Sequence, residues 1–502
     1  MDQNNGGIIG KINTPTTTVA SGVWSLDSQF ESQSGSTWPL AFPQTTFTNS
    51  VRMDGDQSDD SLSRSISGVS TTKFSLSFWT KYAAIEGVGS EAPILFSSEN
   101  NSSDYISFQL NASNQIDFQF QGTQNRRITN RVFRDPSAFY HFLVVIDTTE
   151  STASDRLKIY VNGSQETSFA TSTTNVSQSA NISPLDETLN YSIGRYNGQS
   201  SDFCYDGYFS EFIAVYGQAL TPSSFGAFNP VTNIWEPIAY TGTYGSNGFK
   251  LNFSDSSNLG DDTSGNGNDF TVNNLTSVDQ STDTPSNNFA TMNVIDNYIQ
   301  GATFSEGNLK VVTGASGKYS PTLSTIGVSQ GKWYCEIELD ATGGSGAIVG
   351  VLAKQVTGQA LIGDDANGVA YLLYDGQKRT GGTSSSFGDT LANGDIVGIA
   401  LDLDNNKVYF SKNGTFQASG DPAGNSNGIS VTAPASTDTG FYFIGVQDAG
   451  NGSPGTTYKV NFGSPPYSIS SGNSDANGHG NFEYAVPSGF LALCTKNLAE
   501  NG

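Results

Sequence analysis

The stretch "GDIVGIALDLDNNKVYFSKNG", residues 394–414, contains two apolar runs that flank a group of Asp and Asn residues. In the first run the more apolar side chains occupy alternate positions, which is the period of a β-strand with one buried face. The second run ends at Asn-Gly, a pair typical of tight turns with positive φ. Counted from Asp402, a calcium loop needs Gly at the sixth position and a carboxylate at the twelfth, where this chain has Lys407 and Asn413. The stretch therefore predicts a β-hairpin with a polar turn.

The same pattern occurs once more, in residues 141–163, "HFLVVIDTTESTASDRLKIYVNG". It again has an apolar strand, a polar turn that contains Asp, a second strand and a closing Asn-Gly. At 502 residues the chain is too long for a single core. Two distant copies of one hairpin therefore predict two related jelly-roll or concanavalin-like β-sandwich domains, and the fold class is all-β.

Composition and charge exclude several classes of function. The net charge of −24 disfavours binding to nucleic acid and to anionic membrane surfaces. No run of about twenty apolar residues is present, so we expect no membrane insertion. The start, "MDQNNGGIIGKINTPTTT", lacks the basic and apolar regions of a secretory signal, and the three cysteines lie far apart. These features together predict assembly in a host cytoplasm and release by lysis, as for virus particles.

The chain divides into four segments by composition. Residues 1–45 are rich in Thr, Ser and Gly and form an extended N-terminal docking arm. Residues 46–230 contain short alternating strands, residues 231–290 form a connector with a Gly/Asn/Asp-rich loop, and residues 291–502 contain a second set of strands.

Trp24 and Trp38 stand out in the N-terminal arm. The arm is too polar to bury two indole rings by itself, so these side chains need a partner surface. We predict that they dock the chain onto another virion protein.

Both strand-rich segments resemble known domain families. The order of "FSLSFWTKY", "YHFLVVID", "LKIYVNG" and "GYFSEFIAVYGQALT" resembles the laminin-G-like, concanavalin A-like jelly roll. "GKWYCEIEL", the hairpin of residues 394–414 and the closing "VNFG…PSGFLALCTKNL" resemble a SPRY domain. Together with the start "GGIIGKINTPTTTVASGVWSL", the chain resembles virion structural proteins of tailed bacteriophages, particularly marine ones.

This resemblance implies a non-catalytic structural protein of a phage particle. It would be a tail or head fibre or appendage that attaches to a host-surface glycan or protein, and a homo-oligomer, trimeric if it is a fibre. One alternative is a capsid or tail decoration protein that binds other virion structural proteins. Another alternative is a glycan depolymerase on the concanavalin-like fold. The implied location is the virion.

Candidate catalytic residues are few. Glu336, Glu338 and Asp340 alternate along one strand and so share a face, but glycanases of concanavalin type place Asp between two Glu residues. A solvated acidic face explains the set more simply. His141 and His479 are the only histidines, and neither accompanies a nucleophile motif. We expect no enzymatic activity and no organic cofactor.

The loop "DDTSGNGND", residues 261–269, is the best candidate for Ca²⁺. Asp262, Ser264 and Asn266 fall at alternate positions with Gly267 at the sixth, which reproduces half of a calcium loop. Asp269 or Asp261 can replace the missing carboxylate. The alternative is a Gly/Asn turn held by side-chain-to-backbone hydrogen bonds.

Four arginines cluster in an otherwise acidic chain: Arg126, Arg127, Arg131 and Arg134. Guanidinium groups bind carboxylate, sulfate or phosphate through paired hydrogen bonds, so the cluster is a candidate for binding an acidic subunit or an anionic glycan. The simpler alternative is a solvated strand pair that neighbouring aspartates neutralise.

In the second strand-rich segment, "YLLYDGQKRTGG" places two tyrosines and two cations near a loop: Tyr371, Tyr374, Lys378 and Arg379. SPRY domains bind through loops at one edge, so the resemblance implies that these residues contact a partner. An ordinary strand explains them as well, and we favour that interpretation.

Overall fold

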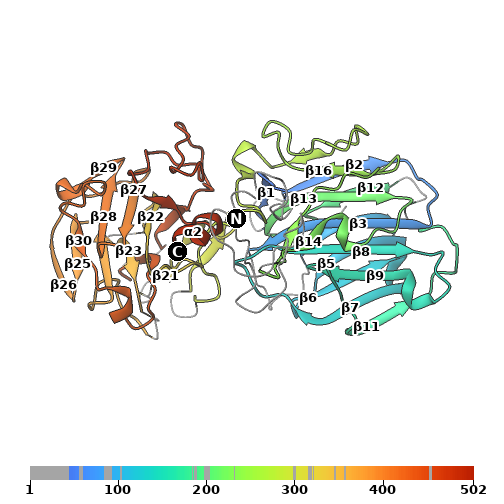
Figure 1. Ribbon diagram of the computed structural model, residues 1–502, viewed down its shortest axis with the longest axis horizontal. Helices are drawn as coiled ribbons and strands as arrows, with labels where there is room; N and C mark the ends of the chain where they lie inside the picture. Colours follow the sequence, from blue (N-terminus) through green and yellow to red (C-terminus); the bar gives the residue numbers. More distant parts are fainter. Residues whose placement is uncertain are drawn as a thin grey trace, which may run out of the picture. The chain divides into compact units, whose positions relative to one another are not determined.

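The computed structural model is built almost entirely of β-strands, and the all-β prediction is confirmed (Figure 1). It describes residues 45–55, 60–83, 93–101, 104–183, 185, 189–196, 204–230, 232–297, 301–314, 319, 321–343, 346–354, 358–450 and 455–502. Trp24 and Trp38 lie outside the described residues. Two compact units are distinguished: Met1–Thr46 with Thr221–Thr241, and Phe47–Leu220 with Gly242–Gly502. Both sandwiches belong to the second unit.

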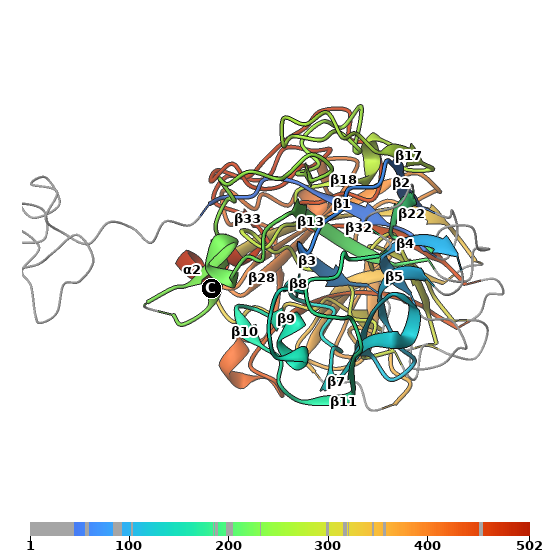
Figure 2. The ribbon, with the colours of Figure 1, turned by 90° about the vertical axis from the view of Figure 1, so that its right-hand side faces the viewer.

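The first sandwich consists of two eight-stranded antiparallel sheets, named here after a central strand. The β3 sheet has the order β10 (Ser164–Gln165), β9 (Leu157–Val161), β8 (Tyr140–Asp147), β3 (Lys73–Tyr82), β13 (Gly207–Tyr216), β1 (Ser50–Met53) and β18 (Gln280–Ser281), and β16 (Phe249–Leu251) also pairs with β13. Several of these strands can be followed side by side in Figure 2.

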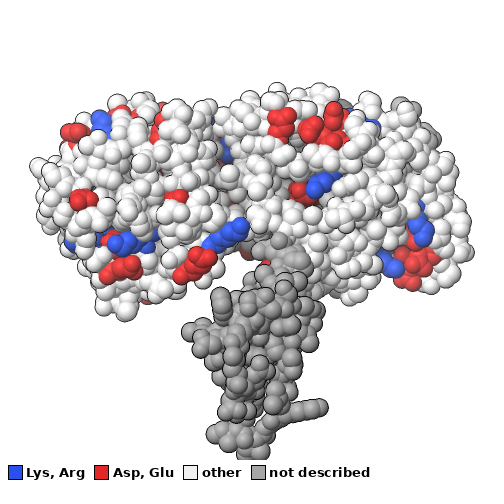
Figure 3. Space-filling model, turned by 45° about the horizontal axis from the view of Figure 1, so that its top comes forward, with Lys and Arg blue, Asp and Glu red and all other residues white. Residues whose placement is uncertain are grey.

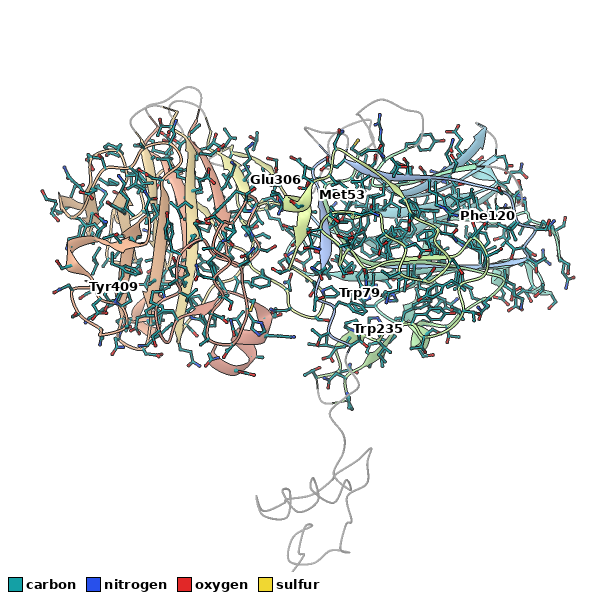
Figure 4. The ribbon with its side chains drawn as sticks, turned by 90° about the horizontal axis from the view of Figure 1, so that it is seen from above. Met53, Trp79, Phe120, Trp235, Glu306 and Tyr409 are labelled. Carbon is teal, nitrogen blue, oxygen red and sulfur yellow. The ribbon has the colours of Figure 1, made fainter. Side chains whose placement is uncertain are left out.

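The opposing β5 sheet has the order β11 (Phe169–Thr174), β7 (Asn125–Val132), β6 (Gln115–Phe120), β5 (Asp104–Leu110), β4 (Ile94–Asn101), β12 (Leu189–Ile193), β2 (Ser61–Ile66) and β17 (Thr271–Asn273). Phenylalanines from the two sheets meet between them. Phe78 of β3 stacks on Phe212 at 4.7 Å between centroids and meets Phe108 of β5 edge-on at 5.1 Å. Figure 4 marks one residue of each sheet, Trp79 and Phe120.

The second sandwich has a nine-stranded and a six-stranded sheet. The β22 sheet has the order β19 (Thr303–Ser305), β20 (Lys310–Val312), β32 (Thr457–Asn461), β22 (Lys332–Ala341), β27 (Ile396–Asp402), β28 (Lys407–Lys412) and β29 (Thr415–Phe416). Two short strands join this sheet: β30 (Ile429–Ser430) on β28, and β33 (Leu491–Ala492), which runs parallel to β22.

The β23 sheet has the order β21 (Thr322–Leu323), β31 (Phe443–Asp448), β23 (Ala347–Leu352), β24 (Gly368–Leu372), β25 (Gln377–Thr380) and β26 (Thr383–Ser386). Alternate residues of β22, including Trp333 and Ile337, are buried in a common core with residues of β23 such as Val349. The chain ends in a short helix, α2 (Thr495–Asn501).

The predicted hairpins are confirmed. β27 and β28 pair up to Asp402 opposite Lys407, and the Asp402 carboxylate accepts hydrogen bonds from the backbone and side-chain nitrogens of Asn405 at 3.0 and 2.8 Å. The closing Asn413-Gly414 pair has φ of 49° and 78°, as a tight turn with left-handed residues requires. The equivalent hairpin of β8 and β9 ends in the same way. The Asp and Asn residues of residues 394–414 therefore form a turn.

The segment that we expected to be a connector takes part in the first sandwich. Its short strands β16, β17 and β18 pair with β13, β2 and β1, respectively. Strands of two or three residues are too short to show a period, which is why the sequence does not reveal them. Separately, β14 (Gly226–Phe228) and β15 (Trp235–Pro237) form a hairpin of the smaller unit. Among the described residues, no helix has the length and apolar character needed to cross a membrane.

Candidate functional site

The outer face of the β5 sheet is polar. Along β5 the side chains of Ile106, Phe108 and Leu110 belong to the core, and the alternating residues Tyr105, Ser107 and Gln109 therefore point to the opposite face. The same alternation holds in β6, where Phe118 and Phe120 are core residues. The face that turns away from the core is thus built from hydroxyl, amide and charged groups.

Register places one polar residue of each strand in a continuous line across the sheet. Residues that lie directly opposite each other in antiparallel strands share a face. The line, called the polar row below, consists of Thr271, Ser63, Ser192, Ser97, Ser107, Gln119, Arg126 and Thr173. Beside it lie Ser65, Asn190, Glu99 and Tyr105 on one flank, and Gln109 and Asp117 on the other. Together these residues form the polar face.

An arginine–carboxylate pair orders one end of the polar face. Arg126 donates from Nε to Asp117 Oδ1 at 2.9 Å and from Nη2 to Oδ2 at 2.5 Å. Gln109 adds a longer hydrogen bond to Asp117 at 3.4 Å. The hydrogen bond to Asp117 raises the pKa of Arg126. Because the two charges neutralise each other, this part of the face offers oriented hydrogen-bonding groups with little net charge.

Two tyrosines bring aromatic surface to the same face. Tyr105 donates its hydroxyl proton to Gln119 Oε1 at 2.9 Å, and its ring is half-buried. Burial raises the pKa of Tyr196 to about 12, and interaction with Glu99 and Tyr105 adds to the shift. Both hydroxyls are therefore protonated at neutral pH and can act as hydrogen-bond donors.

The accessible parts of the polar face lie toward its two ends. The middle of the polar row, namely Ser192, Ser97, Ser107 and Gln119, is buried, and Ser97 Oγ donates to the Arg195 carbonyl oxygen at 3.0 Å. At one end Ser65, Asn190 and Thr271 are exposed, and at the other end Thr173 is exposed and Arg126 is half-buried. Tyr105, on the same strand as Ser107, is half-buried. A ligand on this face would therefore contact the amides, the rings and the guanidinium group rather than the central serines.

The structure divides the predicted arginine cluster. Arg126 lies on the polar face, whereas its neighbour Arg127 points the other way, is buried, and donates to the Thr173 carbonyl oxygen at 2.8 Å. Arg131 pairs with Glu166 at 2.7 Å, and Arg134 is exposed. Adjacent residues of a strand face opposite sides, so this separation was already contained in the sequence. The four arginines do not form one surface.

The acidic residues of β22 have separate roles, and their interpretation as a solvated acidic face is wrong for Glu336. Glu336 is fully buried, and its carboxylate accepts hydrogen bonds from the backbone N–H groups of Glu483 at 2.9 Å and Tyr484 at 2.8 Å. Glu338 and Asp340 are partly exposed and pair with Lys459 at 3.7 and 2.8 Å. Glu336 therefore holds a backbone segment in place.

Of the residues suggested by resemblance in the second sandwich, Tyr371 is buried and donates its hydroxyl proton to the Asp389 carbonyl oxygen. Tyr374 is 37% exposed. Lys378 and Arg379 lie on β25, where Arg379 donates from Nε to Asp364 at 2.7 Å. Tyr371 therefore belongs to the core, and only the other three reach the surface.

The Asp262 loop is held by hydrogen bonds. The Asp262 carboxylate accepts from the backbone nitrogens of Lys250, Ser264 and Asn268 at 2.8–2.9 Å, and from the Ser264 hydroxyl at 2.8 Å. Asp269 accepts from the Asp262 backbone nitrogen at 3.0 Å. The amide of Asn266 donates to the carbonyl oxygens of residues 245 and 248. Within the described residues no group of three or more His, Cys, Asp or Glu side chains is placed to hold a metal ion.

Comparison with known families agrees with this architecture. Residues 54–224 match the Concanavalin A-like lectin/glucanases superfamily, and residues 332–423 match the SPRY domain. The chain thus contains a concanavalin A-like domain and a SPRY domain. These two matches suggest a carbohydrate- or protein-binding module.

Solved structures that match parts of the chain include the SPRY domain of human HERC1, at 19% identity over 32% of this chain and 92% of that chain, with a TM-score of 0.25. The native heptameric SAP-like pentraxin from Limulus polyphemus matches at 12% identity over 46% of this chain and 94% of its own, with a TM-score of 0.29. Stonustoxin matches at 15% identity over 34% of this chain and 27% of its own, with a TM-score of 0.26.

Proposed function

We propose that the chain is a non-catalytic binding protein and that the polar face of the β5 sheet binds a neutral glycan. The observation that carries this proposal is the polar row, which crosses all eight strands of one sheet. Sugars present hydroxyl groups that both donate and accept hydrogen bonds, and the face offers matching hydroxyls, amides and a neutralised ion pair. The rings of Tyr105 and Tyr196 add apolar surface for the C–H side of a sugar.

Charge favours a neutral glycan over a polyanionic one. The chain carries a net charge of −24, which repels sulfated and uronic acid-rich polymers at a distance. On the face shown in Figure 3, basic side chains stand singly or in twos, mostly near acidic ones, and form no extended basic patch. Arg126, the one cation of the polar row, is already paired with Asp117.

The non-catalytic part of the proposal rests on the state of the carboxylates. A glycosidase needs two carboxyl groups free to act on either side of one bond. Glu336 is engaged by two backbone N–H groups, Asp117 by Arg126, and Glu338 lies near Lys459. Incubation of the protein with the polysaccharides that it binds should therefore release no new reducing ends.

A glycan array tests the binding site directly. The array carries neutral hexose oligosaccharides together with sulfated and uronic acid oligosaccharides. We expect wild-type protein to bind neutral members, and Tyr105→Ala to reduce that binding at least tenfold. Tyr160→Ala is the matched control, because Tyr160 is a half-buried tyrosine on the other sheet of the same sandwich. Selective binding of sulfated members, or equal loss in both variants, would reject the polar face as a neutral-glycan site.

We further propose, from the resemblance to proteins of tailed bacteriophages, that the binding protein is a tail or head appendage that attaches the particle to its host. Its partners are then other virion proteins and further copies of itself, and decoration of the capsid or tail is the alternative. Immunogold labelling of intact particles tests this step separately. Label on projecting appendages supports attachment, and a uniform coat supports decoration. Absence of label would mean that the chain is not a component of the virion.

A further inference from the structure

A buried lysine and a buried aspartate meet on the outer face of the β3 sheet. Lys81 lies two residues after Trp79 on the same face of β3, and Trp79 is labelled in Figure 4. Asp283 follows β18, in a segment that the Ser50 hydroxyl fixes by donating to the Asp283 carbonyl oxygen at 2.6 Å. The side chains of Lys81 and Asp283 are each 1% exposed, and Lys81 Nζ contacts Asp283 Oδ2.

The groups around this pair hold its two reactive atoms in place. Lys81 Nζ also donates to Asn288 Oδ1 at 2.9 Å and to the Phe289 carbonyl oxygen at 3.3 Å. On the other side of the carboxyl group, Asp283 Oδ1 accepts a hydrogen bond from the Phe289 backbone nitrogen at 3.1 Å. The amine therefore touches one carboxyl oxygen while a backbone N–H polarises the other.

Aromatic rings enclose the amine. Nζ lies 5.0 Å from the ring centroid of Tyr208 and 5.5 Å from that of Phe139. Isolation from water disfavours charge on both partners: burial lowers the pKa of Lys81 and raises the pKa of Asp283, although the charge of each partner partly opposes the shift of the other. Transfer of one proton from the ammonium to the carboxylate gives a neutral amine beside a neutral carboxylic acid.

We propose that Lys81 and Asp283 join in the folded chain through an amide bond between Nζ and Cγ. The lone pair of the neutral amine attacks Cγ, and the developing negative charge on Oδ1 is stabilised by the Phe289 N–H. Oδ2 takes up a proton from the nitrogen and leaves as water. One C–N bond forms, one C–O bond breaks, and no oxidant or reductant takes part.

Three features of the site favour this condensation. The reacting groups are held together within one chain, which removes the entropic cost of bringing them into contact. A site closed to water favours loss of a water molecule over hydrolysis. Conversion of the ion pair to an amide also removes two charges from a low-dielectric environment, where each is costly. The product would tie β3 covalently to the segment that leaves the first sandwich.

The mass of the purified full-length chain, measured under denaturing conditions, decides the proposal. We expect the mass of the chain to be lower by one water molecule than the mass calculated from its sequence. In a tryptic digest, the peptide that contains Lys81 and extends past it should be joined to the peptide that contains Asp283. An unmodified mass with two separate peptides would overturn the proposal. Loss of ammonia with Lys81 joined to Asn288 would overturn the assignment to Asp283.

Variants give a second, independent reading of the chemistry. Asp283→Asn should form the same amide by loss of ammonia, so its final mass should equal that of the cross-linked wild-type chain. Lys81→Arg keeps a cation but cannot form the bond, and it should show its full sequence mass. Lys73→Arg is the matched control, since the Lys73–Asp147 pair is partly exposed and should leave the cross-link intact. A cross-link that persists in Lys81→Arg would overturn the proposal.

Discussion

The outer faces of two sheets, one in each sandwich, differ in how their buried carboxylate is satisfied. The β5 sheet of the first sandwich carries the polar row, and its buried carboxylate, Asp117, is satisfied by Arg126 from the neighbouring strand. The β22 sheet of the second sandwich carries Glu336, which is satisfied by backbone N–H groups of a later segment. That segment also covers the sheet with an apolar cluster that includes Tyr334 and Phe482, whose rings lie 5.2 Å apart.

This difference shows how one carboxylate on a strand can either keep a face open or close it. A side-chain partner within the sheet leaves the rest of the face to a ligand. A backbone partner from elsewhere brings its own segment with it, and that segment then occupies the face. In the first sandwich the engaged carboxylate thus leaves its neighbours on the sheet face uncovered by a later segment, whereas in the second sandwich the segment around residues 482–484 covers the β22 sheet at Tyr334 and Glu336 and leaves Glu338 and Asp340 partly exposed.

The strongest test of the comparison is Glu336→Ala. The change leaves the partly buried N–H groups of residues 483 and 484 without their acceptor and removes a fully buried side chain, so we expect a loss of about 3 kcal/mol in the free energy of unfolding, measured by urea denaturation. Glu338→Ala is the control, because Glu338 is partly exposed, and it should cost about 0.5 kcal/mol or less. Equal stability of the two variants would mean that Glu336 does not hold the covering segment.

Arg126→Ala tests the other side of the comparison. It leaves the buried Asp117 with only the long hydrogen bond from Gln109, so we expect a loss of about 2 kcal/mol in the same measurement. Arg131→Ala removes an exposed partner of Glu166 and should change stability by about 0.5 kcal/mol or less. If Arg126→Ala proved as mild as Arg131→Ala, the ion pair would not organise the polar face.

The β3 sheet offers a contrast within the first sandwich, because His141 on its outer face is fully buried and contacts Ser77 Oγ at 2.9 Å. Burial lowers the pKa of His141 from 6.5 to about 3. Below pH 6.5 His141 binds a proton in the unfolded chain but stays neutral in the folded chain, so the free energy of unfolding falls as the pH drops toward 3. At pH 5.5 the wild type should have lost about 1.4 kcal/mol more than His141→Gln, relative to pH 7.5.

Guanidinium denaturation at the two pH values measures this difference. The double comparison cancels the titration of all other groups that both proteins share. An identical pH dependence of the wild type and of His141→Gln would show that His141 is accessible to protons in the folded state.

A smaller effect separates two tyrosines of the second sandwich. Tyr371→Phe removes the hydroxyl that donates to the Asp389 carbonyl oxygen and should cost about 1 kcal/mol of stability. Tyr374→Ala alters a surface side chain and should cost about 0.5 kcal/mol or less. Thermal unfolding of both variants checks this, and the reverse order would place Tyr374 rather than Tyr371 in the core.

The smallest effect concerns Ca²⁺. Since the Asp262 carboxylate already accepts four hydrogen bonds, we expect the melting temperature to be the same in millimolar Ca²⁺ and in a chelator. Differential scanning calorimetry measures it. A higher melting temperature in Ca²⁺ than in the chelator, lost in Asp262→Asn, would establish a calcium site in this loop.

Local patterns predicted a large part of the fold. The hairpins at residues 141–163 and 394–414 follow from alternating apolar residues and Asn-Gly turns, both of which act over a few neighbouring positions. The pairing of β16, β17 and β18 with the first sandwich could not be predicted, because strands this short have no period and their partners are distant in sequence.

The candidate site was predicted only in part. Arg126 was among the expected binding residues, but grouping it with Arg127 ignored the alternation of a strand. No sequence pattern predicts the polar row. Its members are single polar residues in eight separate strands, and only the register between the strands brings them together on one surface. Glu336 was noticed as an acidic strand residue, yet nothing near it in the chain indicates its backbone partners at residues 483 and 484.

The sequence by itself determined the all-β class of the protein, its two sandwiches and the turns of their hairpins, because strand period and turn chemistry depend on adjacent residues. Only the tertiary structure decided which face stays polar, which carboxylate is engaged by which partner, and that Lys81 meets Asp283. These outcomes depend on pairing between residues that are far apart in the chain, and such pairing is selected by the packing of the whole fold.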